Sequence, residues 1–286
     1  MEELAIDEIR RAVQAALAED LGSGDVTTLA TVPEDAVARA VMRARGPFVV
    51  AGLTCVEAAF RELSSAVRIE HAAKDGQPIK EGEVLLKISG STRAILSAER
   101  VALNFVQRLS GVATLTAQFV DAVKGTRAKI LDTRKTTPGW RRLEKYAVTC
   151  GGGHNHRFGL FDMVLIKDNH LAALRDESPN AIAGAVRRAR EKYPQLKIEV
   201  EADTLEQVDQ ALAAGADIIL LDNMSLIQLR LAVQKARGRA QTEASGGVSL
   251  ATVRAIAETG VDFISVGALT HSARAVDIGL DFQSES

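Results

Sequence analysis

Residues 198–223 read IEVEADTLEQVDQALAAGADIILLDN, and this stretch decides the fold. Two short apolar runs, IEVEA and IILLDN, flank a segment with helical spacing of its apolar residues and a glycine near its end. A near-continuous apolar run is typical of a strand buried on both faces, and helices usually connect such strands in parallel. The stretch therefore predicts a strand–helix–strand unit of a parallel sheet.

The same unit recurs before and after this stretch, with helix-compatible segments between most of the runs. Six such runs in about 160 residues favour an α/β barrel with fewer than eight strands. A doubly wound sheet is the alternative, although no G-x-G-x-x-G motif follows the first run to indicate dinucleotide binding. The other four runs are KILDT at 129–133, MVLIK at 163–167, TEASGG at 242–247 and FISVG at 263–267.

The part of the chain before Arg108 follows a different pattern. ARAVMRAR at 38–45 alternates apolar and polar residues as a half-buried strand does, and a helix is expected from about Thr54 to Leu63. The segment 74–91 has the glycine-punctuated short strands of a hammerhead-like module, without a lysine placed for lipoyl or biotinyl attachment. A long helix, roughly Thr92 to Lys124, follows. We expect an antiparallel sheet with helices here.

Composition excludes several classes of function. The chain has 35 basic and 37 acidic residues, so nucleic acid is not expected as the main partner. The first 20 residues predict an amphipathic surface helix and not a secretory signal, and nothing in the sequence indicates a membrane. The two cysteines, Cys55 and Cys150, lie far apart, which indicates neither a disulfide framework nor a zinc site and fits a reducing cytoplasm.

A second stretch, residues 131–170, gathers cationic side chains: LDTRKTTPGWRRLEKYAVTCGGGHNHRFGLFDMVLIKDNH. Because the whole chain is nearly neutral, this local positive charge predicts a site for a small polyanion. Arginine can bind a carboxylate through two parallel hydrogen bonds, whereas lysine acts as a point charge. The donors assigned to the site are Arg134, Lys135, His156, Arg157 and Lys167.

Other residues of this stretch are assigned different roles. Arg141, Arg142 and Lys145 lie on a predicted helix at a spacing that faces solvent, so we expect them to be mostly surface charge. The glycine-rich segment 151–156 is expected to form a mobile loop. His154 is expected to be structural, since no acidic or thiolate residue has the spacing of a zinc ligand.

Two carboxylates follow from the strand pattern. Glu199 and Glu201 share one face of their strand, and Asp222 ends the next one, so Glu201 and Asp222 are expected to converge at one rim. Facing a basic pocket, they could hold Mg²⁺ or accept sugar hydroxyls. The alternative is a set of salt bridges that close the barrel, which is the preferred interpretation for Glu199.

Two glycine-containing loops follow the last predicted strands. SGGVS at 245–249 and VGALTHS at 266–272 both precede helical residues, and backbone amides at such positions can bind a phosphate. In α/β barrels the loops after the last strands often form such a site. Each loop alone could be an ordinary tight turn, but together they predict a phosphate site.

These residues and motifs resemble those of the quinolinate phosphoribosyltransferase family. The resemblance extends over essentially the whole chain. Beyond the cationic stretch it includes EDLGSGDVTT at 19–28, ERVALNFVQRLSGVAT at 99–114, EVEADTLEQ at 199–207, ILLDNMS at 219–225, EASGGVS at 243–249 and SVGALTHS at 265–272.

The resemblance implies a fold, an assembly and a reaction. The fold is an N-terminal α/β sandwich domain, residues 1–108, and an incomplete, seven-stranded α/β barrel, residues 109–274, with 275–286 packing back on the first domain. The assembly is a homodimer or a hexamer of three dimers. The reaction joins quinolinate to phosphoribosyl pyrophosphate (PRPP) with Mg²⁺, giving nicotinate mononucleotide, pyrophosphate and CO₂ in de novo NAD synthesis.

The resemblance also implies roles for individual residues. Lys135, Glu201 and Asp222 would be catalytic, with Glu201 and Asp222 also binding the metal and the ribose hydroxyls. Arg100 would reach the site from the neighbouring subunit. The remaining substrate contacts would be Thr133, Arg134, His156, Arg157 and Lys167 around quinolinate, and Ser245, Gly246, Gly247, Gly267, Ala268, Leu269 and His271 around the phosphates.

Two other functions compete with this one. A related transferase could use nicotinate or another acid, as in a similar family associated with molybdenum transport, but nicotinate would leave part of the buried cationic set unpaired. A phosphate-ligand sensor could retain the barrel without catalysis, and the presence of Lys135, Glu201 and Asp222 argues against it. No covalent nucleophile is required, so Cys150 is interpreted as incidental.

Overall fold

A computed structural model describes residues 4–283 of the 286-residue chain. The chain forms two compact units and passes between them more than once. Of the described residues, the first unit comprises 4–117, 136–152 and 269–283, and the second comprises 118–135 and 153–268. Among the described residues, no helix is long and apolar enough to cross a membrane.

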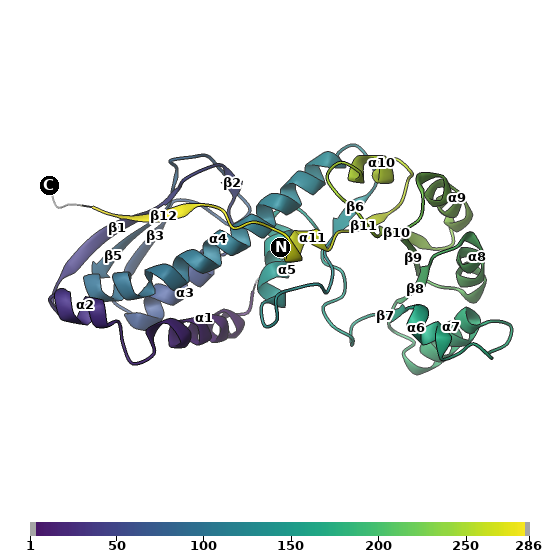
Figure 1. The fold of residues 1–286 in the computed structure, drawn as a ribbon, viewed down its shortest axis with the longest axis horizontal. Helices are drawn as coiled ribbons and strands as arrows, with labels where there is room; N and C mark the ends of the chain where they lie inside the picture. Colours follow the sequence, from purple (N-terminus) through teal and green to yellow (C-terminus); the bar gives the residue numbers. More distant parts are fainter. Residues whose placement is uncertain (1–3, 284–286) are drawn as a thin grey trace. The chain divides into compact units, whose positions relative to one another are not determined.

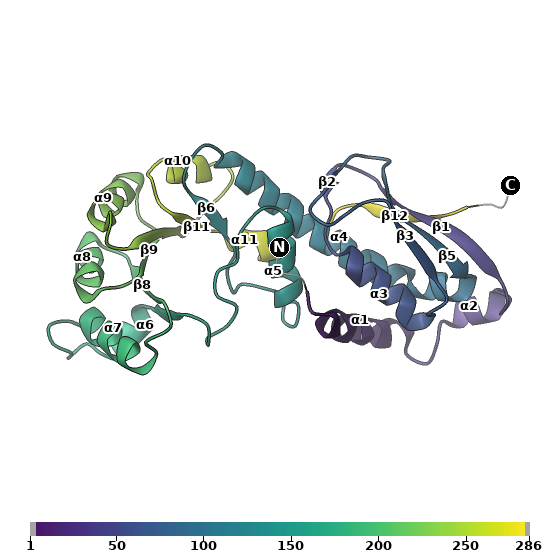
Figure 2. The same ribbon diagram turned by 180° about the vertical axis from the view of Figure 1, so that it is seen from behind.

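The first unit contains an antiparallel sheet with strand order β12-β1-β5-β3. Figure 1 and the reverse view in Figure 2 both show helices α3 (Leu53–Leu63) and α4 (Thr92–Ala122) beside this sheet. The alternating pattern predicted this strand from the sequence, and Ala40, Met42 and Ala44 are buried; Val41 between them is buried too, so the strand is covered on both faces there. The strands are β1 (Val37–Ala44), β3 (Arg68–His71), β5 (Val84–Ser91) and β12 (Ile278–Phe282), with β2 (Phe48–Val49) and β4 (Pro78–Ile79) forming a separate pair.

Helix α1 of the first unit buries one apolar stripe. In α1 the stripe is Ile9, Val13 and Leu17, and α1 packs on α3. The predicted helices near 54–63 and 92–124 are confirmed as α3 and α4. The bounds are α1 (Ile6–Leu21), α2 (Val26–Thr31), α3 (Leu53–Leu63), α4 (Thr92–Ala122), α5 (Arg141–Cys150) and α11 (Ala268–His271).

Helix α5 corrects one prediction. Lys145 is fully buried and not surface charge, because α5 buries most of its circumference and not a single stripe. Glu144, also fully buried, accepts hydrogen bonds from Arg108 and from the backbone and hydroxyl of Thr137. Only Arg142 is largely exposed, and it pairs with Glu8 at 2.8 Å. Charged residue type was therefore a poor guide to exposure in this helix.

The second unit is a parallel sheet of six strands in the order β6-β11-β10-β9-β8-β7. All six apolar runs of the sequence are strands, so the predicted α/β repeat is confirmed. The sheet curves, and α7, α8, α9 and α10 lie along its outer face (Figure 1). The strands are β6 (Lys129–Leu131), β7 (Val164–Ile166), β8 (Ile198–Ala202), β9 (Ile218–Asp222), β10 (Gln241–Ser245) and β11 (Phe263–Ser265); the helices are α6 (Asp168–Ala172), α7 (Ala181–Lys192), α8 (Leu205–Ala214), α9 (Leu226–Ala236) and α10 (Val253–Ala257).

A single residue adds a seventh element to this sheet. His154 forms an isolated parallel bridge with Leu131 of β6. The backbone N–H of His154 donates to Ile130 O at 2.9 Å, and its backbone oxygen accepts from the N–H of Asp132 at 3.1 Å. The predicted seven-stranded barrel is thus six strands and one bridge, with β7 at the other edge of the sheet. The glycine-rich segment was expected to be a loop throughout, and this bridge within it was missed.

Candidate active site

The carboxyl ends of the six parallel strands lie at one edge of the sheet, and most predicted site residues follow from this topology. Asp222 ends β9 and Ser245 ends β10, and the two residues are direct register partners. Glu201 lies one residue before the end of β8. The other predicted residues of this unit lie just after a strand or in the segment between β6 and β7: Thr133, Arg134 and Lys135 after β6; His156 and Arg157 in that segment; Lys167 after β7; Gly246 and Gly247 after β10; and Gly267 and Ala268 after β11.

Lys167 and Glu201 form an ion pair across the ends of β7 and β8. The Glu201 side chain is 14% exposed and that of Lys167 is 43% exposed, so the pair lies at the border between the core and solvent. An ammonium group and a carboxylate are thus held side by side, where groups of either charge on a small molecule could be bound.

Arg134 and Arg157 bring two guanidinium groups together at this edge. Both residues are half-buried, and Arg157 Nη1 donates to Met163 O at 3.2 Å. Burial, and next the charge of Arg134, lowers the pKa of Arg157 from its usual value. The nearby carboxylates of Glu199 and Asp162 act in the opposite direction and raise this pKa. A bound anion would add to their effect on the two arginines, and the polyanion site stays a prediction.

Asp132 positions the loop that carries His156 and Arg157. Its side chain is fully buried, and Oδ1 accepts the backbone N–H of His156 at 2.8 Å. Nearby, Thr133 Oγ1 accepts the N–H of Lys135 at 3.0 Å, which closes a turn after β6. Lys135 itself is exposed.

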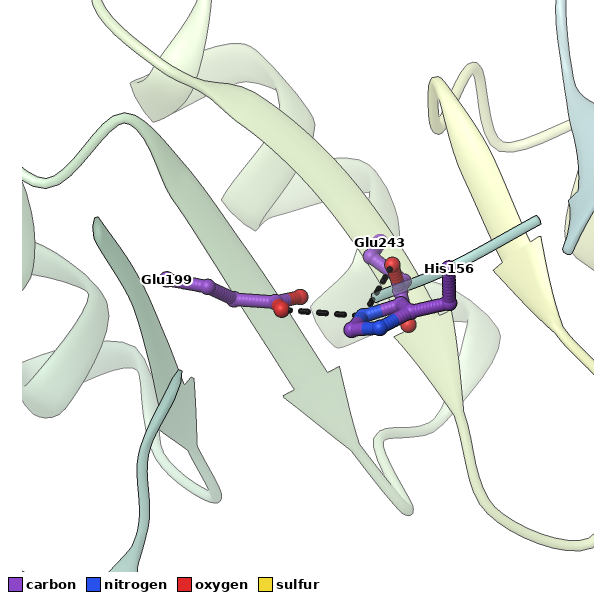
Figure 3. Close-up of side chains that lie close together, drawn as sticks. All are labelled: His156, Glu199 and Glu243. Atoms are coloured by element: carbon purple, nitrogen blue, oxygen red, sulfur yellow. Dashed lines mark hydrogen bonds and ion pairs between the residues drawn. The ribbon is translucent and has the colours of Figure 1, made fainter. Parts of the chain in front are cut away.

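His156 lies between two buried carboxyl groups, as Figure 3 shows. Its Nε2 is 3.0 Å from Glu199 Oε2 and 3.6 Å from Glu243 Oε2. Burial raises the pKa of Glu199 to about 7; burial and then the charge of Glu199 raise that of Glu243 to about 8. Glu243 was missed from the sequence because TEASGG was interpreted only for its glycines. Glu243 is the second residue of a run that was predicted to be a buried strand, and a carboxyl group inside such a strand was the available sign of a functional residue.

The three side chains offer ligand atoms within 4.8 Å of one another, as a metal site would. The hydrogen bonds of the imidazole argue against that interpretation. Nδ1 accepts the backbone N–H of Arg157 at 2.8 Å, so the proton of a neutral ring lies on Nε2, the atom that faces the carboxyl groups. A metal-bound nitrogen must be deprotonated, and the other nitrogen then donates. The cluster is therefore a hydrogen-bonded one.

Asp222 is held by a hydrogen bond, and the two glycines that follow β10 have left-handed backbone conformations. Asn223 Nδ2 donates to Asp222 Oδ2 at 2.6 Å. Gly246 and Gly247, just after β10, have φ angles of 94° and 58°, which side chains disfavour. A backbone of this kind can approach phosphate oxygens closely.

Three predicted site residues belong to the first unit and are described with it. Arg100 is exposed on α4. In α11, Leu269 is buried, whereas His271 is exposed with its Nδ1 2.6 Å from Ser272 Oγ. The remaining predicted residues all lie in the second unit.

Comparison with known proteins defines the class of the chain. Family models of phosphoribosyltransferase domains match it: the N-terminal domain of quinolinate phosphoribosyl transferase at residues 25–110, and the C-terminal domain at residues 112–281. The nicotinate-nucleotide pyrophosphorylase (carboxylating) of Mycobacterium leprae is 47% identical over 281 residues, covering 96% of this chain and 97% of the relative. The chain belongs to the quinolinate phosphoribosyltransferase family.

Other relatives agree. The probable nicotinate-nucleotide pyrophosphorylase (carboxylating) of Bacillus subtilis is 44% identical over 265 residues, covering 92% of this chain and 89% of the relative. The solved structure of the nicotinate-nucleotide pyrophosphorylase from Francisella tularensis has a TM-score of 0.92 at 40% identity and covers 98% of both chains. The resemblance first noted in the motifs thus extends to the fold.

Proposed function

We propose that this protein transfers the phosphoribosyl group of PRPP to quinolinate and decarboxylates the product. Nicotinate mononucleotide, pyrophosphate and CO₂ would result, in de novo NAD synthesis. The observation that carries the proposal is the pair of half-buried guanidinium groups, Arg134 and Arg157, at the same sheet edge as Lys167. Three cations in one place suit a substrate with two adjacent carboxylates.

Quinolinate would be bound by these three cations, with Arg100 contributed by the neighbouring copy of a homodimer, or of a hexamer of three dimers. Thr133 and His156 stay in this set as predictions. The contacts of His156 with Glu199 and with the Arg157 backbone support a role in fixing the loop that carries Arg157. Lys135 would lie between the quinolinate and diphosphate ends of the site.

PRPP would be bound by the carboxylates and by the glycine-containing loops. Glu201 and Asp222 would meet the ribose hydroxyls and hold Mg²⁺, either directly or through PRPP and water; carboxylate oxygens are the donors that this ion prefers. When bound, the ion would neutralise charge that develops on the pyrophosphate. The proposed phosphate contacts are Ser245, Gly246, Gly247, Gly267, Ala268, Leu269 and His271.

In the reaction, the ring nitrogen of quinolinate attacks the anomeric carbon as pyrophosphate leaves. The bond between the ring and the adjacent carboxylate then breaks and CO₂ leaves; the positive charge of the pyridinium nitrogen stabilises the electron pair left on the ring carbon, and a proton from water takes the place of the carboxylate. Both steps need orientation and exclusion of water more than a covalent nucleophile. Arg134, Arg157 and Lys167 would supply the orientation. The buried thiols of Cys55 and Cys150 are given no part in this reaction, and a cytoplasmic location stays a prediction of the sequence.

A direct assay tests the proposal. Purified protein is incubated with Mg²⁺, PRPP and either quinolinate or nicotinate, and nucleotide and CO₂ are followed together. We expect both products from quinolinate and none from nicotinate. If nucleotide forms only from nicotinate, the pocket binds a monocarboxylate and not a dicarboxylate. If neither acid gives a product, a binding protein without catalysis becomes the better interpretation.

A further inference from the structure

Asn223 has an unusual backbone conformation at the end of β9. Its φ angle is 53°, and in the described part of the chain it is the one residue other than glycine with a positive φ. The left-handed region is costly for most side chains and is tolerated by asparagine, whose short amide can make local hydrogen bonds. A residue held in this region next to a candidate site deserves a functional explanation.

Three contacts of Asn223 connect the ends of two neighbouring strands. Its backbone N–H donates to Ser245 O at 3.0 Å, which joins β9 to β10. Its side-chain Nδ2 donates to Asp222 Oδ2 at 2.6 Å. The other end of the same amide lies against Gly246: a Cβ on Gly246 would overlap Asn223 Oδ1 and lie 2.5 Å from Asn223 Cγ.

We infer that Asn223 is a positioning residue that holds the Asp222 carboxylate and the Ser245–Gly247 loop in one fixed arrangement for PRPP. The inference rests on the proposed function, since it takes Asp222 and the loop as the ribose and phosphate contacts. One side of the amide fixes the rotamer of the carboxylate, and the other is seated against the glycine whose φ is 94°. The left-handed backbone allows both contacts from one side chain.

Other residues would satisfy only part of this role. Glycine would accept the backbone conformation but lacks the amide. Aspartate tolerates the conformation and has the same shape, yet it would place a second carboxylate beside Asp222. Both substitutions tolerate the left-handed backbone, and both remove the hydrogen bond that the amide donates to Asp222. Their effects therefore report the loss of this hydrogen bond and not a change of backbone conformation.

The test compares N223G and N223D with the wild-type full-length protein, in steady-state kinetics and in calorimetric titration with PRPP and Mg²⁺. Loss of a hydrogen bond to a charged group predicts a KM for PRPP raised by roughly ten- to a hundredfold in N223G, and by at least as much in N223D. The KM for quinolinate should stay within about twofold, because that pocket lies on β6 and β7.

A matched control is the reverse substitution at another left-handed position. Gly238 has a φ of 74° and nothing within 4 Å of an added Cβ. It follows α9 and precedes β10, away from the carboxyl ends of the strands. G238N should leave both KM values unchanged, which separates the effect at Asn223 from that of any asparagine–glycine exchange.

Two results would overturn the inference: wild-type affinity for PRPP in a folded N223G, or equal rises of both KM values, which would indicate general disorder of the site. If N223G does not fold, as judged by circular dichroism, N223D decides the question by the same criteria. A wild-type protein that binds PRPP but makes no nucleotide would refute the proposed function alone, because the calorimetric comparison would still test Asn223.

Discussion

At the residue scale, Arg157 shows how the fold creates binding capacity. Its guanidinium group is half-buried close to Arg134, and its backbone is tied to His156. Each of these contacts restricts where the charge can point. The side chain is thus held in place before a ligand is bound, which lowers the entropic cost of binding.

Replacing Arg157 should therefore remove activity without unfolding the protein. We expect R157A to lower kcat/KM for quinolinate by roughly a hundredfold or more, since a bidentate charged contact is worth about 3 kcal/mol. R142A is the matched control, because Arg142 is an exposed arginine paired with Glu8. Normal turnover by R157A would exclude the anion pocket.

Lys145 gives a stability prediction of a different kind. The side chain is fully buried in α5, so K145A would remove packed methylene groups and leave a cavity. We expect the free energy of unfolding in urea to fall by about 2 to 4 kcal/mol. R142A on the same helix should change it by less than about 0.5 kcal/mol. Equal effects of the two variants would contradict the buried position of Lys145.

The sequence predicted where a residue lies along a strand. It did not predict which side chains from distant segments come into contact. The place of Glu201 near the end of a strand could be predicted from the strand pattern, whereas the roles of Arg157 and Glu201 in binding stay predictions. Glu243 could not be predicted, because its partners His156 and Glu199 come from other segments. Lys145 was misplaced because a charged side chain was taken as exposed.

At the element scale, β8 and β10 carry Glu199 and Glu243 into the core, and this makes stability depend on pH. Burial raises the pKa of Glu243 from 4.5 to about 8. Between these values the folded protein keeps a proton that the unfolded chain has lost. The contribution to stability is therefore complete below the lower value and is lost as the pH rises to the upper one.

Urea denaturation measured across this pH range checks the prediction. The wild-type free energy of unfolding should fall with rising pH by up to about 1.4 kcal/mol per pH unit for this group. E243Q, which cannot ionise, should show a shallower slope. Identical slopes for the two proteins would show that Glu243 titrates normally.

The strands of the parallel sheet could be predicted because both of their faces are buried. Five runs that contain isoleucine, leucine or valine became strands, because helices cover a parallel sheet on the outside and side chains fill the inside; TEASGG, which contains none of the three, became the sixth. The bridge at His154 could not be predicted, since one paired residue in a glycine-rich segment leaves no periodic pattern.

At the scale of the whole molecule, the proposal that Arg100 acts across a dimer interface predicts a site shared between two copies of the chain. Arg100 is exposed and belongs to the first compact unit, whereas Lys167 belongs to the second. If Arg100 acts across a dimer interface, R100A and K167A should each be inactive alone. Mixed dimers would contain one intact site, so mixing the two variants should restore up to about a quarter to a half of wild-type activity.

A dimer in which both subunits carry the same substitution provides the control. Subunits are exchanged, and mixed dimers are isolated through two different affinity tags before the assay. Mixed dimers of R100A with a second R100A protein should stay inactive. No recovery in proven R100A–K167A dimers would contradict a site shared between subunits.

The central claim is that a dicarboxylate binds where Arg134, Arg157 and Lys167 meet at the carboxyl ends of the strands. The most direct test is a crystal structure of the protein with quinolinate. We predict both carboxylates of quinolinate within hydrogen-bonding distance of these three side chains. Quinolinate bound at the other edge of the sheet, or with its carboxylates turned away from the arginines, would contradict the account.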